Sequence, residues 1–262
     1  MTIKISRRLQ CIADLVPQGS KVADIGSDHA LLPAYLVKEG IVTFSIAGEV
    51  NKGPYEAALR QVKGTLIEDK VSVRLGDGLA VIKPGEVDCI TIAGMGGSLI
   101  ASILNADKAK LEGVNTLILQ PNVGEEFVRR WLSENGWLLQ EEHILEEDGK
   151  IYEILLASKV DSDTFMKEEQ HLYQDQPLGT LTLDRSWLMQ LGPYLVRQPD
   201  EVLIKKWSNE IRKQERILST MAATNSNEVK EKREHFEAYK RALEEIVACW
   251  QKDKRSLNGW KN

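Results

Sequence analysis

The chain has 262 residues, a formal net charge of −5 at pH 7 and a hydrophobic content of 42%. This length and composition are ordinary for a globular protein and allow one large core with an appended region. The opening residues lack the apolar run of a secretory signal, and no stretch is long and apolar enough to cross a bilayer. Three distant cysteines and four scattered histidines argue against a disulfide framework and a metal site. We therefore expect a cytoplasmic protein that contacts no membrane and holds no metal.

The charge is distributed unevenly. Residues 196–262 hold 15 Lys and Arg against 11 Asp and Glu, whereas the other 195 residues hold 19 against 28. A basic tail behind an acidic core is a modest indication of a polyanionic partner, although solvated helices also produce this asymmetry by chance.

Short apolar runs rich in β-branched residues alternate with helical patterns from residue 20 to about residue 135. Strands are predicted at Lys21–Ile25, Thr43–Val50, Val71–Leu75, Asp88–Ala93 and Asn115–Leu119. Helices are predicted between them at Leu31–Glu39, Gly53–Val62, Ser98–Leu104 and Glu125–Asn135. Five successive βα units predict a doubly wound parallel sheet with right-handed crossovers.

Two further strands, Trp137–Leu145 and Lys150–Ser158, are joined by a segment that ends in Asp148-Gly149, a hairpin signal. An antiparallel hairpin at the end of a parallel sheet departs from the six-stranded dinucleotide-binding pattern. It resembles the seven-stranded sheet of class I methyltransferases. We therefore predict a class I (Rossmann-like) α/β core over residues 1–160.

Residues 161–262 are predicted to form a helical region, with loops and short helices up to residue 198. Two apolar stripes with heptad spacing follow Pro199, separated by the turn-like residues 224–227. They predict an antiparallel coiled-coil hairpin over about residues 199–252. The first stripe contains Ile204, Trp207, Ile211, Leu218 and Met221, and the second contains Val229, Phe236, Tyr239, Leu243, Ile246 and Trp250.

Acids and glycines lie where the predicted parallel strands end, which is the edge at which an open α/β sheet binds its ligand. In chain order these positions are Asp24 and Gly26, Glu49, Asp77 and Gly78, Ala93 to Gly97, and Gln120 to Asn122. Asp28 stands where a dinucleotide-binding loop has its second glycine. A carboxylate there repels a pyrophosphate but attracts an ammonium or a sulfonium, which favours S-adenosylmethionine over NAD or FAD.

Each acid has a matching role on that cofactor and a simpler alternative. Glu49 suits the ribose hydroxyls, Asp77 the adenine amine and Asp28 the methionyl ammonium, while Gly78 lets the adenine ring approach the backbone. Alternatively, Asp24 and Asp28 cap the following helix, Glu49 is a solvated loop acid, and Asp77-Gly78 is only a turn. His29 either borders the pocket or fills space.

The segment from Ala93 to Gly97 lacks the acid and aromatic residues that amino-directed DNA methyltransferases place after the fourth strand. Three glycines around Met95 indicate a close backbone approach and a helix N-terminus that faces a ligand, or else a purely structural tight turn. We count Ala93, Gly94 and Met95 among the predicted cofactor contacts.

Several motifs occur together and in order, and their combination resembles the TrmK family of bacterial tRNA (adenine-22-N1)-methyltransferases. They are Ser6-Arg7-Arg8-Leu9, Ala23 to His29, Ala47-Gly48-Glu49-Val50, Lys52-Gly53-Pro54-Tyr55, Arg74 to Gly78, Ala93 to Gly97 and Leu119 to Asn122. The resemblance runs nearly end to end. It implies a class I fold, S-adenosylmethionine as the methyl donor, and methylation of N1 of an adenine in the D-arm of tRNA.

The reaction that this resemblance implies needs little proton transfer, because N1 of a neutral adenine carries a free lone pair. Asp28, His29 and Asn122 are the residues that we expect at the methyl-transfer site. Arg7 and Arg8 are expected to hold phosphates near the pocket, or else to lie on an exposed helix face. The tail is expected to bind folded RNA by shape and charge through Lys205, Lys206, Arg212, Lys213, Lys232 and Arg233.

Other interpretations remain open. A methyltransferase that acts on another RNA and a non-catalytic adaptor that binds the cofactor both fit the strand-end motifs. The tail hairpin also fits a dimerisation device, although a monomer is our expectation.

Overall fold

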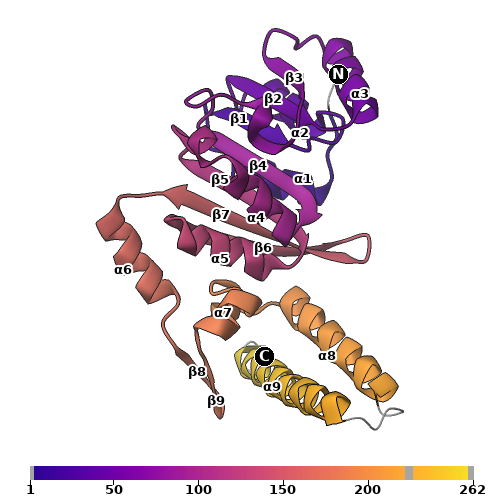
Figure 1. Cartoon of the computed structure of the whole chain (residues 1–262), viewed down its shortest axis with the longest axis vertical. Coiled ribbons are helices and arrows are strands. Elements are labelled where there is room, and N and C mark those ends of the chain that lie inside the picture. Colours follow the sequence, from indigo (N-terminus) through magenta and orange to yellow (C-terminus); the bar gives the residue numbers. More distant parts are fainter. Residues whose placement is uncertain (1–2, 222–226, 259–262) are drawn as a thin grey trace. The chain divides into compact units, whose positions relative to one another are not determined.

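A seven-stranded sheet of order β3-β2-β1-β4-β5-β7-β6 organises the first part of the chain (Figure 1). The structure is a computed structural model that describes residues 3–221 and 227–258. Five strands run parallel to their neighbours, and β6 and β7 are antiparallel. The strands are β1 (Lys21–Ile25), β2 (Phe44–Glu49), β3 (Val71–Leu75), β4 (Cys89–Gly96), β5 (Thr116–Val123), β6 (Trp137–Glu147) and β7 (Lys150–Lys159).

The helices of this part follow the predicted alternation. They are α1 (Arg7–Asp14), α2 (Leu31–Lys38), α3 (Lys52–Thr65), α4 (Gly97–Ala106), α5 (Glu125–Glu134) and α6 (Ser162–Leu172), with short 3-10 turns η1 (Gly78–Val81) and η2 (Lys108–Leu111). Helices α1, α2 and α3 share one apolar cluster with buried strand residues such as Val22, Ala47 and Ile118. Helix α2 buries residues on most of its surface, which explains why its sequence is apolar on all sides.

The predicted strand ends are confirmed for β1 and β3, whereas β4 and β5 run past their predicted ends to Gly96 and Val123. Register shifts between Ala93 and Gly96 let these two strands stay paired beyond the regular ladder. The hairpin signal is also confirmed, because Asp148 and Gly149 have φ of 50° and 73°, the positive values that a type I′ turn requires.

A buried ionic cluster fastens α5 to the hairpin. The Arg129 Nε donates to Glu142 Oε1 at 2.6 Å, and the same guanidinium also binds Glu153. All three side chains are almost completely buried. Removing one partner would leave a buried charge uncompensated, so the cluster fixes α5 against the hairpin.

The chain divides into two compact units between Leu172 and Tyr173. Our expected core ended at residue 160, but α6 belongs to the first unit, where Ser133 Oγ of α5 donates to Glu169 Oε1 of α6 at 2.7 Å. The second unit contains β8 (Gln176–Leu178), β9 (Leu181–Leu183), α7 (Arg185–Leu191), the 3-10 turn η3 (Leu195–Arg197), α8 (Glu201–Met221) and α9 (Asn227–Asn258). None of the helices in the described ranges is long and apolar enough to span a membrane.

Helices α8 and α9 pack against each other, as the two apolar stripes predict. Their seam is rotated from the predicted one on α8, where Leu203, Trp207 and Gln214 are buried while Ile204, Ile211, Leu218 and Met221 are half-buried. On α9 the buried residues are Leu243, Ile246, Val247 and Trp250. Of the predicted break, residues 224–226 lie outside the described residues, as does the side chain of Val229.

Candidate functional site

The loop after β1 has an unusual backbone. Gly26 has a φ of 73°, and Asp28, His29 and Ala30 have φ of 43°, 66° and 55°, a run of three left-handed residues without glycine. The Gly26 and Ser27 N–H groups donate to the carbonyl of Gly48 at 2.9 and 3.1 Å, which holds the loop against β2. Strained backbone of this kind is typical of functional sites, where surrounding contacts over-determine it.

The loop leaves two polar side chains in solvent. The side chains of Asp28 and His29 are 88% and 59% exposed, and Asp28 Oδ1 lies 3.4 Å from His29 Nε2. Helix α2 begins directly afterwards with Ala30 as its cap residue and without a side-chain cap. Neither Asp24 nor Asp28 therefore caps α2, so the simpler interpretation of these two acids is wrong.

Asp24 is instead the buried support of the loop. Its Oδ2 accepts from Ser27 Oγ and its Oδ1 accepts from Thr91 Oγ1, both at 2.6 Å. Burial raises the pKa of the Asp24 carboxyl, and the two hydroxyl donors partly offset that effect. Asp24 thus joins the β1 loop to β4, a contact that the sequence motif did not reveal.

Glu49 ends β2 and is a residue only 6% exposed. Within the described part of the chain, its buried Oε1 has no hydrogen-bond partner. Burial raises the pKa of Glu49, and hydrogen bonding to the His29 backbone partly offsets this. The interpretation of Glu49 as a solvated loop acid is wrong. A buried acceptor without a donor is costly, so this oxygen indicates that a ligand supplies one.

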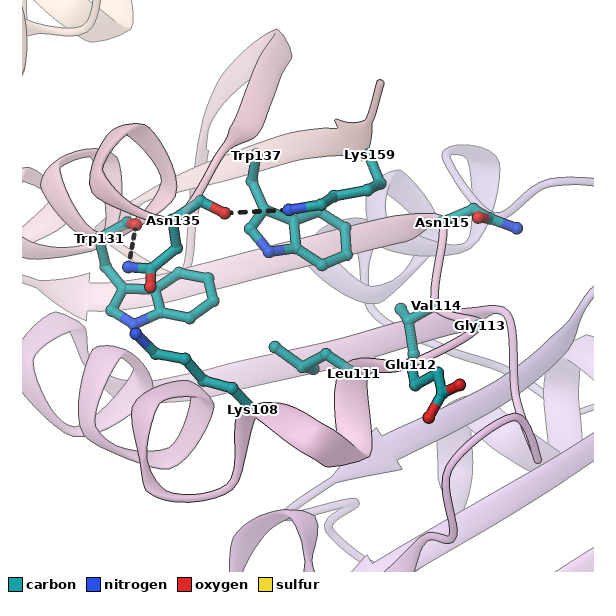
Figure 2. Close-up of a pocket in the computed structure, with 10 residues that line it drawn as sticks. All are labelled: Lys108, Leu111, Glu112, Gly113, Val114, Asn115, Trp131, Asn135, Trp137 and Lys159. Carbon is teal, nitrogen blue, oxygen red and sulfur yellow. Dashed lines mark hydrogen bonds between the residues drawn. The ribbon is translucent and has the colours of Figure 1, made fainter. Parts of the chain in front are cut away.

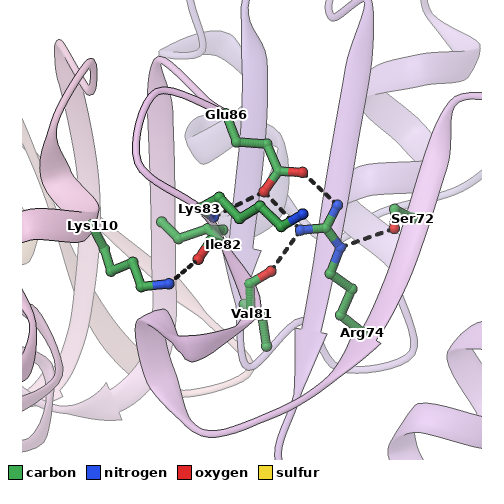
Figure 3. A network of polar contacts seen from close by, with 7 residues as sticks. All are labelled: Ser72, Arg74, Val81, Ile82, Lys83, Glu86 and Lys110. Carbon is green, nitrogen blue, oxygen red and sulfur yellow. Dashed lines mark hydrogen bonds and ion pairs between the residues drawn. The ribbon is translucent and has the colours of Figure 1, made fainter.

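The segment after β3 is held by an ion pair. The Arg74 guanidinium donates to both Glu86 oxygens at 2.6 and 2.8 Å and to the Val81 carbonyl at 2.8 Å (Figure 3). Glu86 also accepts from the Lys83 N–H at 2.9 Å. We call these residues, Arg74, Val81, Lys83 and Glu86, the loop clamp. It fixes the turn that follows Asp77.

Asp77 and Gly78 themselves lie at the surface of that turn. Asp77 is exposed and makes no side-chain cap for η1. Gly78 has a φ of 50°, and a Cβ on it would lie 3.1 Å from Ile103 Cγ2. These observations explain the glycine by backbone conformation and by crowding, and they leave the exposed Asp77 carboxylate available to a ligand.

A chain of amides joins the ends of β4 and β5. Gln120 Oε1 accepts from the Arg8 guanidinium at 2.5 Å and from the Gly94 N–H at 3.1 Å. Gln120 Nε2 donates to Asn122 Oδ1 at 3.1 Å, and Asn122 Nδ2 donates to the Gly94 carbonyl at 2.8 Å. Because a guanidinium can only donate, Arg8 determines which way both amides point.

Arg8 reaches this chain from α1. Its guanidinium lies 5.3 Å from the centre of the Tyr152 ring, and the Arg7 and Arg8 N–H groups donate to Glu147 at the tip of the β6–β7 hairpin. The structure therefore gives Arg8 internal contacts, while Arg7 is exposed. Sequence reasoning missed the role of Gln120. The available signal was a polar side chain at the end of a buried strand.

Gly97 and Gly26 are both crowded, but by different neighbours. A Cβ on Gly97 would overlap the Gly124 carbonyl, so the close backbone approach is real but its partner is the chain itself. A Cβ on Gly26 would overlap only the end of the Met95 side chain, which covers the β1 loop and is flexible. Met95 therefore lies beside Gly26, at the site formed by the carboxyl ends of the parallel strands β1 to β5, which we call the strand-end site.

The basic residues expected to bind RNA in the second unit are largely exposed, but several have acidic neighbours. Lys213 Nζ lies 3.1 Å from Glu210, and Arg233 Nε lies 2.9 Å from Glu237. Lys206 Nζ is 5.4 Å from the centre of the Trp207 ring. The remaining members of the set, Lys205, Arg212 and Lys232, are exposed.

The strand order, the terminal antiparallel pair and the acids at the carboxyl edge define a Rossmann-like methyltransferase domain. The family model for tRNA (adenine(22)-N(1))-methyltransferase, TrmK, matches residues 22–245. The tRNA (adenine(22)-N(1))-methyltransferase of Bacillus subtilis strain 168 is 41% identical over 246 residues, which are 94% of this chain and 98% of that protein. The chain belongs to the TrmK family.

Solved structures agree with this assignment. The crystal structure of the B. subtilis m1A22 tRNA methyltransferase TrmK superposes with a TM-score of 0.82 at 41% identity, covering 94% of this chain and 99% of that one. The Streptococcus pneumoniae protein Sp1610, solved in complex with S-adenosyl-L-methionine, superposes with a TM-score of 0.77 at 37% identity, covering 93% of this chain and all of that one.

Proposed function

We propose that this protein transfers the methyl group of S-adenosylmethionine to N1 of adenine 22 in tRNA. Membership of the family supports the reaction, and one structural feature of this chain supports S-adenosylmethionine as the cofactor. That feature is the buried Glu49 oxygen without a donor, placed at the end of β2. Vicinal ribose hydroxyls are donors of the kind that this oxygen lacks.

The other strand-end residues fit the rest of the cofactor by charge. The exposed Asp28 carboxylate suits the methionyl ammonium, and Asp77 suits the adenine amine. Gly26 and Met95 lie beside the β1 loop, and Asp24 positions that loop without facing solvent. Gly78, His29, Ala93 and Gly94 remain predicted cofactor contacts.

When bound, S-adenosylmethionine supplies an activated methyl group on its sulfonium. The residues around it have to hold the adenine with N1 aimed at that methyl group, since alignment is the main source of acceleration when no base is needed. Asn122 is suited to this task because Gly94 and Gln120 fix the orientation of its amide, and its Oδ1, which accepts one hydrogen bond from Gln120, has a second lone pair for the adenine amine. The product adenine is cationic, so the Asp28 carboxylate expected at the methyl-transfer site would stabilise it electrostatically.

The RNA must present the Watson–Crick edge of the adenine, so the base is unpaired or extruded before it reacts. Arg7 and the exposed basic residues of α8 and α9 are proposed to bind phosphates of the folded tRNA. Arg8 is proposed to act through Gln120 and not on a phosphate, because its guanidinium is engaged inside the protein. The protein is proposed to act as a cytoplasmic monomer.

Calorimetric titration with S-adenosylmethionine tests the cofactor assignment. Loss of a charged acceptor for ligand hydroxyls costs about 2 kcal/mol, so Glu49→Gln should weaken binding roughly 30-fold while leaving the fold intact. Glu56→Gln, which changes an exposed glutamate of α3, is the matched control and should bind like the wild type. Equal affinity for wild type and Glu49→Gln would show that Glu49 does not contact the cofactor.

A further inference from the structure

A cavity lies at the opposite edge of the sheet from the strand-end site. It has a volume of about 410 Å³, within the range of roughly 300–1,000 Å³ that is typical of small-molecule sites. The turn η2, the residue before β5, the end of α5, the start of β6 and the end of β7 form its walls (Figure 2). The cavity lies at the amino end of the parallel strand β5, beside the start of β6 and the end of β7, so it is distinct from the cofactor edge.

The apolar part of this cavity consists of Trp131, Trp137, Leu111 and Val114. The Trp131 side chain belongs to a residue that is only 6% exposed, and among the described residues no acceptor pairs with its indole N–H. Buried indole N–H groups usually find a partner. This donor is available to an acceptor on a ligand in the cavity.

The polar part of the cavity is rich in donors. Lys159 Nζ lies 5.2 Å from the centre of the Trp137 ring and donates to the Asn135 carbonyl at 3.0 Å, so it retains further protons to donate. Lys108 lines the cavity from η2 and is exposed, and Glu112 is the single acid in the lining. Two ammonium groups against one carboxylate favour an anionic ligand.

Partial burial lowers the pKa of Lys159, which shows that its charge is poorly solvated where it stands. A bound anion would compensate this charge. The amides of Asn115 and Asn135 also line the cavity and can pair with donors and acceptors on the edge of a heteroaromatic ring.

We propose that this cavity binds a nucleotide, with the base against the tryptophans and the phosphate on Lys108 and Lys159. A nucleotide has a flat base that can pack on the apolar wall, polar atoms that can pair with the indole N–H and the amides, and a phosphate that can bind the two ammonium groups. The nucleotide comes either from solution or from an unpaired position of the bound tRNA. Only the second source depends on the proposed tRNA substrate.

The test follows the indole N–H resonance of Trp131 in 15N-labelled full-length protein, assigned with Trp131→Phe. The strand-end site is first saturated with S-adenosylhomocysteine, so that added nucleotide cannot enter it. Adenosine monophosphate and uridine monophosphate are then titrated separately, followed by unmodified tRNA. Failure of S-adenosylhomocysteine to bind would count against the proposed function and is seen before this site is tested.

A saturable shift of the Trp131 resonance with a mononucleotide identifies a site for free nucleotide. A shift with tRNA alone identifies a site for a nucleotide of the RNA. In either case Lys108→Gln and Lys159→Gln should each weaken the response about tenfold, the effect of one lost charged contact. Lys70→Gln, which changes an exposed lysine before β3 at the other side of the sheet, should have no effect. The proposal is overturned if neither mononucleotide nor tRNA shifts the Trp131 resonance. It is also overturned if the shift is unchanged in both Lys108→Gln and Lys159→Gln.

Discussion

Replacing Glu86 with glutamine should destabilise the protein in a way that depends on pH. The substitution removes the charge from the loop clamp but keeps one oxygen that can accept from Arg74. The paired guanidinium lowers the pKa of Glu86 to about 2 from its ordinary 4.5. That change corresponds to roughly 3 kcal/mol of unfolding free energy. Because the two side chains are 28% and 23% exposed, solvent screening reduces our expected loss to about 1–2 kcal/mol.

The sign of the pH dependence follows from the direction of the pKa change. A carboxyl group with a lowered pKa in the folded state contributes its full stabilisation above pH 4.5 and loses it as the pH falls towards 2. The difference in stability between wild type and Glu86→Gln should therefore be constant near neutrality. By pH 3.5 it should have lost more than half of its value at neutral pH.

Urea unfolding of both proteins between pH 7 and pH 3.5 measures this difference. Glu237→Gln is the control, since it breaks an exposed pair with Arg233 on α9 and should change stability little at any pH. A difference that is absent at pH 7, or that stays the same down to pH 3.5, would refute the assignment of a stabilising charge pair to the loop clamp.

Three further predictions concern single residues. Gly97→Ala should lower the free energy of unfolding by about 3 kcal/mol, because the new Cβ overlaps the Gly124 carbonyl. Gly64→Ala, which adds a Cβ in open space on α3, should raise the free energy of unfolding by about 0.5–1 kcal/mol. Urea unfolding of both variants measures these changes. Burial raises the pKa of Asp24, so the stability that its neutral form provides is lost as the pH rises above the ordinary 3.8. The stability of Asp24→Asn relative to wild type should accordingly increase from pH 4 to pH 8. If the difference between the thermal unfolding midpoints of the two proteins stays the same over this range, the prediction is wrong. Asn122→Ala should lower the methyl-transfer rate roughly 10-fold to 100-fold with unchanged affinity for S-adenosylmethionine, and wild-type turnover would show that Asn122 does not orient the adenine.

The sheet was predictable because each strand is a short β-branched run between turn residues. β1 and β3 have the predicted bounds, and the Asp-Gly hairpin is where the sequence places it. The end of β4 was not predictable, because its extension depends on register shifts with β5 and not on its own composition. Strands β8 and β9 were missed since three residues are too few to show an alternating pattern.

The candidate site was predictable in position but not in connectivity. Strand-end acids could be located because every parallel strand ends at the same edge. Which of them are buried could not, since the burial of Asp24 and Glu49 depends on Thr91 and on the loop from Gly26 to Ala30. Likewise, Arg8 is separated from Gln120 by more than a hundred residues, and no local pattern predicts that contact.

The most direct test of the account is methyl transfer from labelled S-adenosylmethionine into unmodified tRNA. An otherwise identical transcript in which adenine 22 is replaced serves as the comparison. We expect label in the first transcript and none in the second. Equal label in both would contradict the assignment to adenine 22, and no label in either, with the cofactor bound, would contradict the assignment of tRNA methylation to this protein.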